Sequence, residues 1–224
     1  MSTTRPVFGN GVAQTASLPV LNRYNGLKFA DNDSPRPTDR FYFSYNGYSG
    51  VNRGVNPEGY RDLYVNRETI GFEKTLFGGL ASVGMRLPFV QAGGAALYDT
   101  SEIGDLSIIS KMAWWNDPTT GSVISSGVNI TVPTGGRDDT ALLSNGFPAP
   151  RALFVQPWTG FVANMDNWYV QGATSFVAPS HTEFPLASFT SLAAGYWLVR
   201  NDSESAVIRG LVPTAEVHVN IPLN

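Results

Sequence analysis

The sequence predicts an all-β fold, an up-and-down antiparallel transmembrane β-barrel, from its composition, its strand-like runs and the connections between them. Charged residues make up only 15% of the 224 residues, aromatic residues reach 12%, and there are 23 glycines. This composition is poor for helices and favours strands joined by turns. A single all-β domain of this length is usual, so one barrel domain is expected.

Nine strand-like runs follow one another after an N-terminal lead-in segment. Residues 1–39 are rich in turn-forming residues and are predicted to be irregular, and residues 40–224 are predicted to form the barrel. No helical periodicity of useful length interrupts the runs. They lie at residues 40–48, 60–75, 80–90, 104–115, 122–134, 151–163, 168–179, 187–199 and 206–221.

The connections between these runs alternate between short and long. The short ones are LFGG, NDPTTG, NMDN and RNDSES, and the long ones are SGVNRGVNPEG, QAGGAALYDTSEI, GGRDDTALLSNGFPAP and SHTEFPL. Every second connection of an up-and-down sheet lies at the same end, so short turns should gather at one end and long loops at the other. This asymmetry is typical of outer-membrane barrels.

Apolar and polar side chains alternate along the clearest runs, as a strand with two different faces requires. In run 80–90 the apolar set is Ala81, Val83, Met85, Leu87 and Phe89, and the polar set includes Ser82, Gly84, Arg86 and Pro88. In run 122–134, Ile124, Val128, Ile130 and Val132 oppose Ser125, Gly127, Asn129 and Thr131. A soluble β-sandwich that acts as a binding or structural module also alternates, and it is the rival interpretation.

Polar and charged side chains on the predicted lumen face are candidates for lining a passage, because rings of charge bias which solutes pass. They are Arg67, Thr69, Glu73, Arg86, Asp105, Lys111, Asn129, Thr131, Glu216 and His218. The alternative is that opposite charges inside the barrel only neutralise one another.

Other functional classes find little support in the sequence. The absence of Cys excludes thiolate metal sites and Cys nucleophiles. Glu216 and His218 are too few ligands for a metal site, and Ser180 with the adjacent His181 lacks the third group of a hydrolase triad. No enzyme activity and no cofactor are therefore expected. The formal charge of -3 has no block of one sign, which argues against nucleic acid as a partner.

Any membrane location would have to depend on strands, since no stretch approaches 18 consecutive apolar residues. The first 20 residues lack the apolar core of a signal peptide. The expected location is nevertheless the bacterial outer membrane, with its lipid and small-molecule solutes as partners.

Five stretches of the chain resemble a family of outer-membrane β-barrel transporters, named for the meta-cleavage pathway of phenol degradation and often seen in planctomycete-type bacteria. The stretches are KFADNDSPRPTDRFYFSYNGY (28–48), TIGFEKTLFGGLASVGMRLPF (69–89), GDLSIISKMAWW (104–115), GVNITVPTG (127–135) and GLVPTAEVHVNIPL (210–223). The resemblance implies a barrel that admits hydrophobic, aromatic compounds by passive passage. None of the stretches is a binding or catalytic signature.

The number of runs predicts that the barrel is not closed by these runs alone. Run one leads into a long loop, and because each run reverses direction, the ninth run ends on the same side. Bacterial single-chain barrels have an even number of strands. We therefore expect nine or ten strands, with one missing or contained in residues 1–39, and an open sheet with runs one and nine as its edges.

Overall fold

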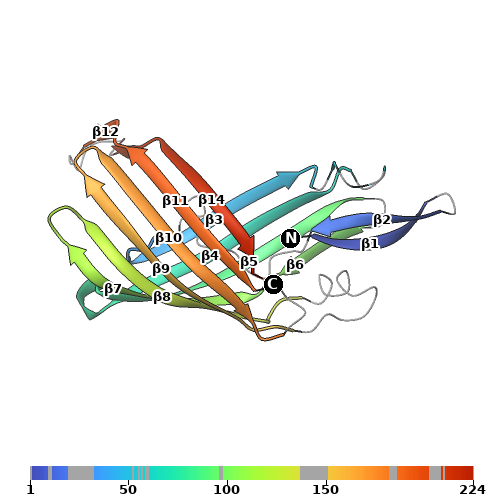
Figure 1. The fold of residues 1–224 in the computed structure, drawn as a ribbon, viewed down its shortest axis with the longest axis horizontal. Helices are drawn as coiled ribbons and strands as arrows, with labels where there is room; N and C mark the ends of the chain where they lie inside the picture. Colours follow the sequence, from blue (N-terminus) through green and yellow to red (C-terminus); the bar gives the residue numbers. More distant parts are fainter. Residues whose placement is uncertain are drawn as a thin grey trace.

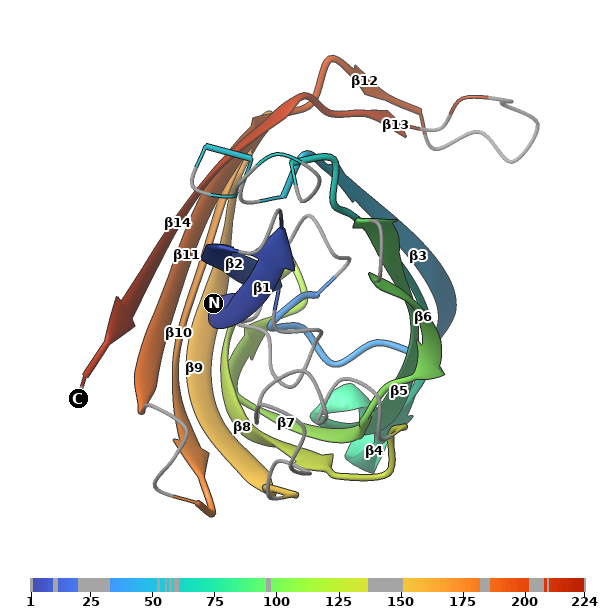
Figure 2. The ribbon, with the colours of Figure 1, turned by 90° about the vertical axis from the view of Figure 1, so that its right-hand side faces the viewer.

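The computed structural model is all-β, and its main element is one strongly curled antiparallel sheet that forms a half-barrel (Figures 1 and 2). The structure describes residues 2–9, 12–19, 33–51, 53–54, 56, 58, 61–95, 98–136, 151–181, 186–201, 208 and 210–223. Within these residues, no helix has the length and apolar character needed to cross a membrane.

Nine strands, each paired antiparallel with the next, form the continuous path of the sheet, as the nine runs predicted. They are β3 (Arg40–Ser49), β4 (Tyr64–Leu76), β5 (Ala81–Ala95), β7 (Leu106–Asp117), β8 (Ser122–Val132), β9 (Phe154–Met165), β10 (Trp168–Pro179), β11 (Ala187–Tyr196) and β14 (Thr214–Pro222). The up-and-down order is confirmed, and the last two runs are shorter than predicted.

The sheet is open, with β3 and β14 as the two ends of its strand order. Neighbouring strands of the path run in opposite directions. Because β3 and β14 are the first and the last of nine strands, they run in the same direction. The start of β11 pairs with the end of β14, at Ala187 and Pro222. The predicted open sheet with these edges is therefore what the described residues form.

Three of the four predicted short turns are present. Residues 77–80 join β4 to β5 through the 3-10 turn η2 (Phe77–Gly79), residues 118–121 join β7 to β8, and residues 166–167 join β9 to β10. In the second turn, the Asp117 carboxylate accepts hydrogen bonds from the Thr119 backbone N–H at 2.9 Å and the Thr120 hydroxyl at 2.8 Å. These bonds stabilise the reversal of the chain, a usual role for Asp in turns.

Two predicted connections were wrong. The segment QAGGAALYDTSEI was expected to be a loop, but β5 continues into it and pairs with β6 (Tyr98–Ile103). The segment RNDSES was expected to be a short turn, but β11 and β14 are joined by residues 197–213, which include the small hairpin of β12 (Val199–Arg200) and β13 (Gly210–Leu211). Glycines and polar residues indicate where a chain can turn, but they do not determine where the pairing between strands ends.

The lead-in segment is not irregular throughout, which corrects the prediction for residues 1–39. It contains β1 (Ser2–Gly9) and β2 (Val12–Pro19), which pair antiparallel as a separate two-stranded sheet. Residues 33–39, by contrast, have no regular secondary structure and lead directly into β3.

The two faces of the curled sheet have opposite polarity. The convex face carries a row of large apolar side chains that are direct cross-strand partners on six neighbouring strands: Phe41, Phe72, Met85, Ile108, Ile130 and Val155. All of these but Met85 are exposed, Phe41 to 76%. The concave face buries polar side chains, among them Arg67, Thr69, Glu73, Ser82, Lys111, Ser125, Asn129 and Gln156. This distribution is the reverse of a sandwich, whose apolar face is internal.

A tyrosine lying on a glycine fixes the β3–β4 pair on the concave face. Tyr42 is buried and pairs with Gly71, where an added Cβ would lie 2.3 Å from the Tyr42 Cζ atom. The Arg40 guanidinium carbon lies 4.7 Å from the centre of the same ring. An aromatic ring over a strand glycine is a known way to stabilise the glycine's register.

We expect Gly71→Ala to lower the free energy of unfolding by about 1–3 kcal/mol, because the new methyl group displaces the Tyr42 ring from a packed position. Urea unfolding of the purified protein, followed by tryptophan fluorescence, measures the change. Gly54→Ala is the matched control, since a Cβ at Gly54 meets nothing within 4 Å. Equal stability of the two variants would contradict the packing role of Gly71.

Candidate functional site

A short segment, Asp33–Thr38, lies inside the curl of the sheet and is called the interior strap (Figure 2). Its sequence, DSPRPT, has two prolines, each of which fixes the backbone φ angle near -65°. Pro35 is fully buried and Pro37 is buried. At Gly160 of β9 an added Cβ would lie 2.9 Å from Pro35 Cγ, so the strap packs closely against the sheet.

Side chains of the sheet bind the carbonyl groups of the strap. The Lys111 ammonium donates hydrogen bonds to the carbonyls of Ser34 at 2.8 Å and Arg36 at 3.4 Å. The Ser125 hydroxyl donates to the Pro35 carbonyl at 2.6 Å. Three consecutive carbonyls are thus satisfied, as buried backbone groups require.

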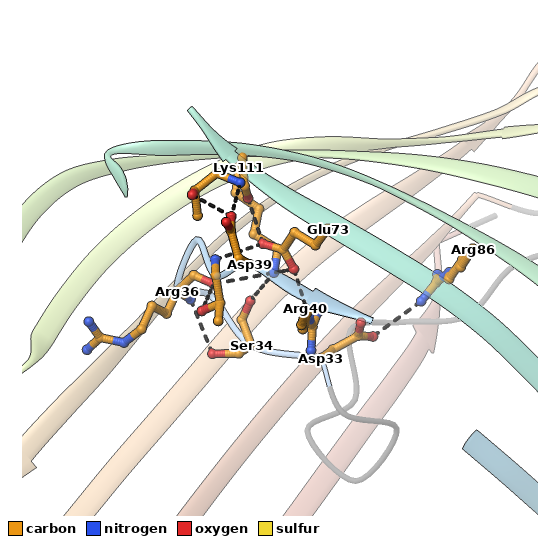
Figure 3. Close-up of polar contacts among 11 residues, drawn as sticks. Asp33, Ser34, Arg36, Asp39, Arg40, Glu73, Arg86 and Lys111 are labelled. Carbon is orange, nitrogen blue, oxygen red and sulfur yellow. Dashed lines mark hydrogen bonds and ion pairs between the residues drawn. The ribbon is translucent and has the colours of Figure 1, made fainter. Parts of the chain in front are cut away.

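Glu73 is the centre of the buried polar network that holds the strap (Figure 3). Its carboxylate lies 2.8 Å from the Lys111 ammonium and 2.8 Å from Arg40 Nε, and it accepts a 2.6 Å hydrogen bond from the Ser82 hydroxyl. The Thr38 backbone N–H donates to the same carboxylate at 3.2 Å. The side chains of Glu73 and Lys111 are both only 3% exposed, so each charge is stabilised by the opposite charge of its partner and not by water.

Two further acidic groups hold the ends of the strap region. Asp33, at its start, forms an ion pair of 3.3 Å with Arg86 of β5. Asp39, between the strap and β3, accepts hydrogen bonds from the Lys74 ammonium and from the Thr75 backbone and hydroxyl. The hydrogen bonds from Lys74 and Thr75 hold the pKa of the exposed Asp39 carboxyl well below its usual range.

Hydrogen-bonded polar side chains continue along the concave face beyond the strap. The Asn129 amide donates to Gln156 at 3.2 Å, and the Gln156 amide donates to the Ser175 hydroxyl at 2.9 Å. Ser107 and Thr131 share a hydrogen bond of 2.9 Å. These five side chains, called the polar ladder, link β7 to β10 and leave this part of the inner wall polar.

The structure brings together five of the predicted lining residues around the strap or in the polar ladder. Glu73, Lys111 and Arg86 contact the strap or one another, and Asn129 and Thr131 belong to the polar ladder. Arg67 is buried on the same face of the sheet. That these residues line a passage stays a prediction.

The other predicted lining residues lie apart from this group. Asp105 is not on a strand but between β6 and β7, where its carboxylate accepts a 2.9 Å hydrogen bond from the Gly135 backbone. On β14, His218 Nε2 lies 3.3 Å from the Glu216 carboxylate and His218 Nδ1 lies 2.8 Å from the Ser191 hydroxyl. Among the described residues no three His, Asp or Glu side chains gather as a metal site would require.

The loop pair Ser180 and His181 has a structural role that accounts for the serine. The Ser180 backbone N–H donates to the Leu153 carbonyl at 2.8 Å, and the Leu153 N–H donates to the Ser180 hydroxyl at 2.9 Å. The hydroxyl therefore helps to join the residue that follows β10 to the residue that precedes β9.

An apolar cluster lies on the concave face beside the polar ladder. Ala152, Phe154 and Val177 are buried together, and Phe189 packs against them. Phe154 is two residues from Gln156 on β9, so both side chains are on the same face of the strand. The inner surface thus combines a charged part at the strap with an apolar part on β9–β11.

The strap is the part of the site that the sequence reasoning missed. The sequence predicts an irregular lead-in at DNDSPRPTDR, because Pro, Ser and Asp indicate irregular backbone. The two prolines flanking Arg36 were an available signal for a rigid extended segment. Comparison with known proteins adds no assignment, because no family model, no curated protein and no solved structure matches the chain.

Proposed function

We propose that this chain forms the wall of a bacterial outer-membrane β-barrel that lets small solutes pass passively, without catalysing a reaction. The observation that carries the proposal is the polarity of the sheet, with large apolar side chains exposed on the convex face and polar groups buried on the concave face. An exposed row of large apolar side chains is unfavourable in water and suits contact with lipid.

Two observations support the kind of solute that the resemblance implies, a hydrophobic or aromatic compound. The cluster around Phe154 and Phe189 offers apolar contacts on the inner face. The polar ladder beside it offers both hydrogen-bond donors and hydrogen-bond acceptors. Mostly apolar surfaces with a few polar groups are typical of sites for small organic molecules.

Two tryptophans on opposite faces test the membrane orientation directly. Trp114 on β7 is 69% exposed on the convex face, and Trp158 on β9 is 4% exposed on the concave face. Variants that keep only one of these tryptophans, with the others replaced by Phe, are reconstituted into vesicles containing lipids brominated along their acyl chains. We expect strong quenching of Trp114 fluorescence and little quenching of Trp158.

The opposite outcomes distinguish the rival interpretation. A β-sandwich or other soluble protein remains monodisperse without detergent, and neither tryptophan is then quenched by brominated lipid. Equal quenching of Trp114 and Trp158 would mean that the sheet is bound to the membrane in some other orientation. Only selective quenching of Trp114 supports the proposed barrel wall.

A further inference from the structure

Arg36 occupies an unusual position, at the centre of the interior strap between two buried prolines. Its half-buried side chain points away from the Glu73 cluster (Figure 3). One terminal nitrogen lies 3.5 Å from the position of a Cβ at Gly121, in the turn between β7 and β8. The guanidinium is thus directed toward the short-turn end of the curled sheet.

The backbone of Arg36 is fixed, whereas its guanidinium forms no ion pair within the described residues. Its N–H donates to the Ser34 hydroxyl at 3.2 Å, and its carbonyl accepts from the Lys111 ammonium at 3.4 Å. Within the described part of the chain, the Arg36 guanidinium takes no part in the ion pairs that bind Glu73 and Asp33. Such preorganisation lowers the entropy cost of binding a ligand.

The charges around the strap favour an anion. Among the described residues around the strap, four basic side chains, Arg36, Arg40, Arg86 and Lys111, gather with Asp33 and Glu73, while a third acidic group, Asp39, is paired with Lys74. Glu73 pairs with Lys111 and Arg40, and Asp33 pairs with Arg86, so within this described group Arg36 is the basic side chain available to a solute. A guanidinium binds a carboxylate through two parallel hydrogen bonds, which a compact ammonium cannot do.

We propose that Arg36 is a specificity-determining residue that makes the passage selective for small anions, with carboxylates as the organic class it recognises. This inference rests on the proposed function. The strap holds the guanidinium inside the half-barrel, and the excess of basic over acidic groups among the described residues around it lowers the electrostatic barrier for anions and raises it for cations.

The test is the reversal potential of the protein in a planar lipid bilayer under a KCl gradient. For the wild type, we expect a reversal potential whose sign corresponds to preferential passage of chloride over potassium. Arg36→Gln should shift this potential toward zero, Arg36→Glu should shift it toward cation preference, and Arg36→Lys should keep chloride preference. Added sodium benzoate should reduce the chloride current of the wild type more than that of Arg36→Lys, since only the guanidinium binds the carboxylate through two hydrogen bonds.

Arg200→Gln is the matched control, because it removes the same charge from an exposed side chain of β12, on a hairpin that is not part of the strap network. Equal shifts for Arg200→Gln and Arg36→Gln, or a wild type without chloride preference, would overturn the inference. Swelling of vesicles in arabinose, a neutral solute, tests the proposed passage separately from its anion preference. Swelling without anion preference leaves the proposed function standing, whereas no swelling and no current contradict the passage itself.

Discussion

Glu73→Gln should lower the free energy of unfolding by about 3–5 kcal/mol, the range found when one partner of a buried ion pair is removed. The amide keeps the shape of the carboxylate but leaves the ammonium of Lys111 and the guanidinium of Arg40 without the charge that they contact at 2.8 Å. Urea unfolding in detergent micelles, followed by tryptophan fluorescence, gives the change.

A control on the same strand separates this effect from a general loss of charge. Glu68 lies on β4 facing the other side of the sheet, so Glu68→Gln should change stability by less than about 0.5 kcal/mol. The double variant Glu73→Gln with Lys111→Met should recover part of the loss, because it removes the unpaired ammonium. If Glu73→Gln matches Glu68→Gln, the network does not hold the strap.

Ile130→Arg should cost about 2–4 kcal/mol if the convex face contacts lipid near the midplane, where an arginine loses its hydration. Ile130 belongs to the apolar row and lies between its partners Ile108 and Val155. In a soluble protein the same change at a side chain that is 37% exposed should have little effect. Folding into lipid vesicles at several urea concentrations measures the cost.

Thr119→Arg provides the matched comparison, because Thr119 is exposed in the turn between β7 and β8, beyond the apolar row. We expect this variant to fold like the wild type. Ile130→Leu tests side-chain shape without charge and should cost less than about 1.5 kcal/mol. A tolerated Arg at both positions would remove the main support for a lipid-facing surface.

The strands and their faces could be predicted from the sequence because a strand places alternate residues on opposite sides. The alternation in run 80–90 predicted that Ser82 and Arg86 share one face and Val83 and Leu87 the other, and the burial of Ser82 with the exposure of Val83 agrees. Predictions of this kind depend only on neighbouring residues, so they need no knowledge of the rest of the fold.

The site could be predicted only in part, because its geometry depends on contacts between distant segments. Glu73 and Lys111 were assigned to the correct face, but their pairing and their common partner, the strap, could not be inferred from local patterns. Asp105 was misplaced because a Gly-Asp pair before a strand can belong either to the strand or to the preceding turn. Here it lies before β7 and binds the backbone of Gly135.

The contacts of the strap also constrain the order of folding. The hydrogen bond from Lys111 to Ser34 joins positions 77 residues apart, and that from Ser125 to Pro35 joins positions 90 residues apart. Contacts of such long sequence separation require closure of large loops, which slows their formation. The strap, although it precedes β3 in the chain, can therefore reach its final place only after β7 and β8 have paired, so the interior of the sheet is completed late in folding.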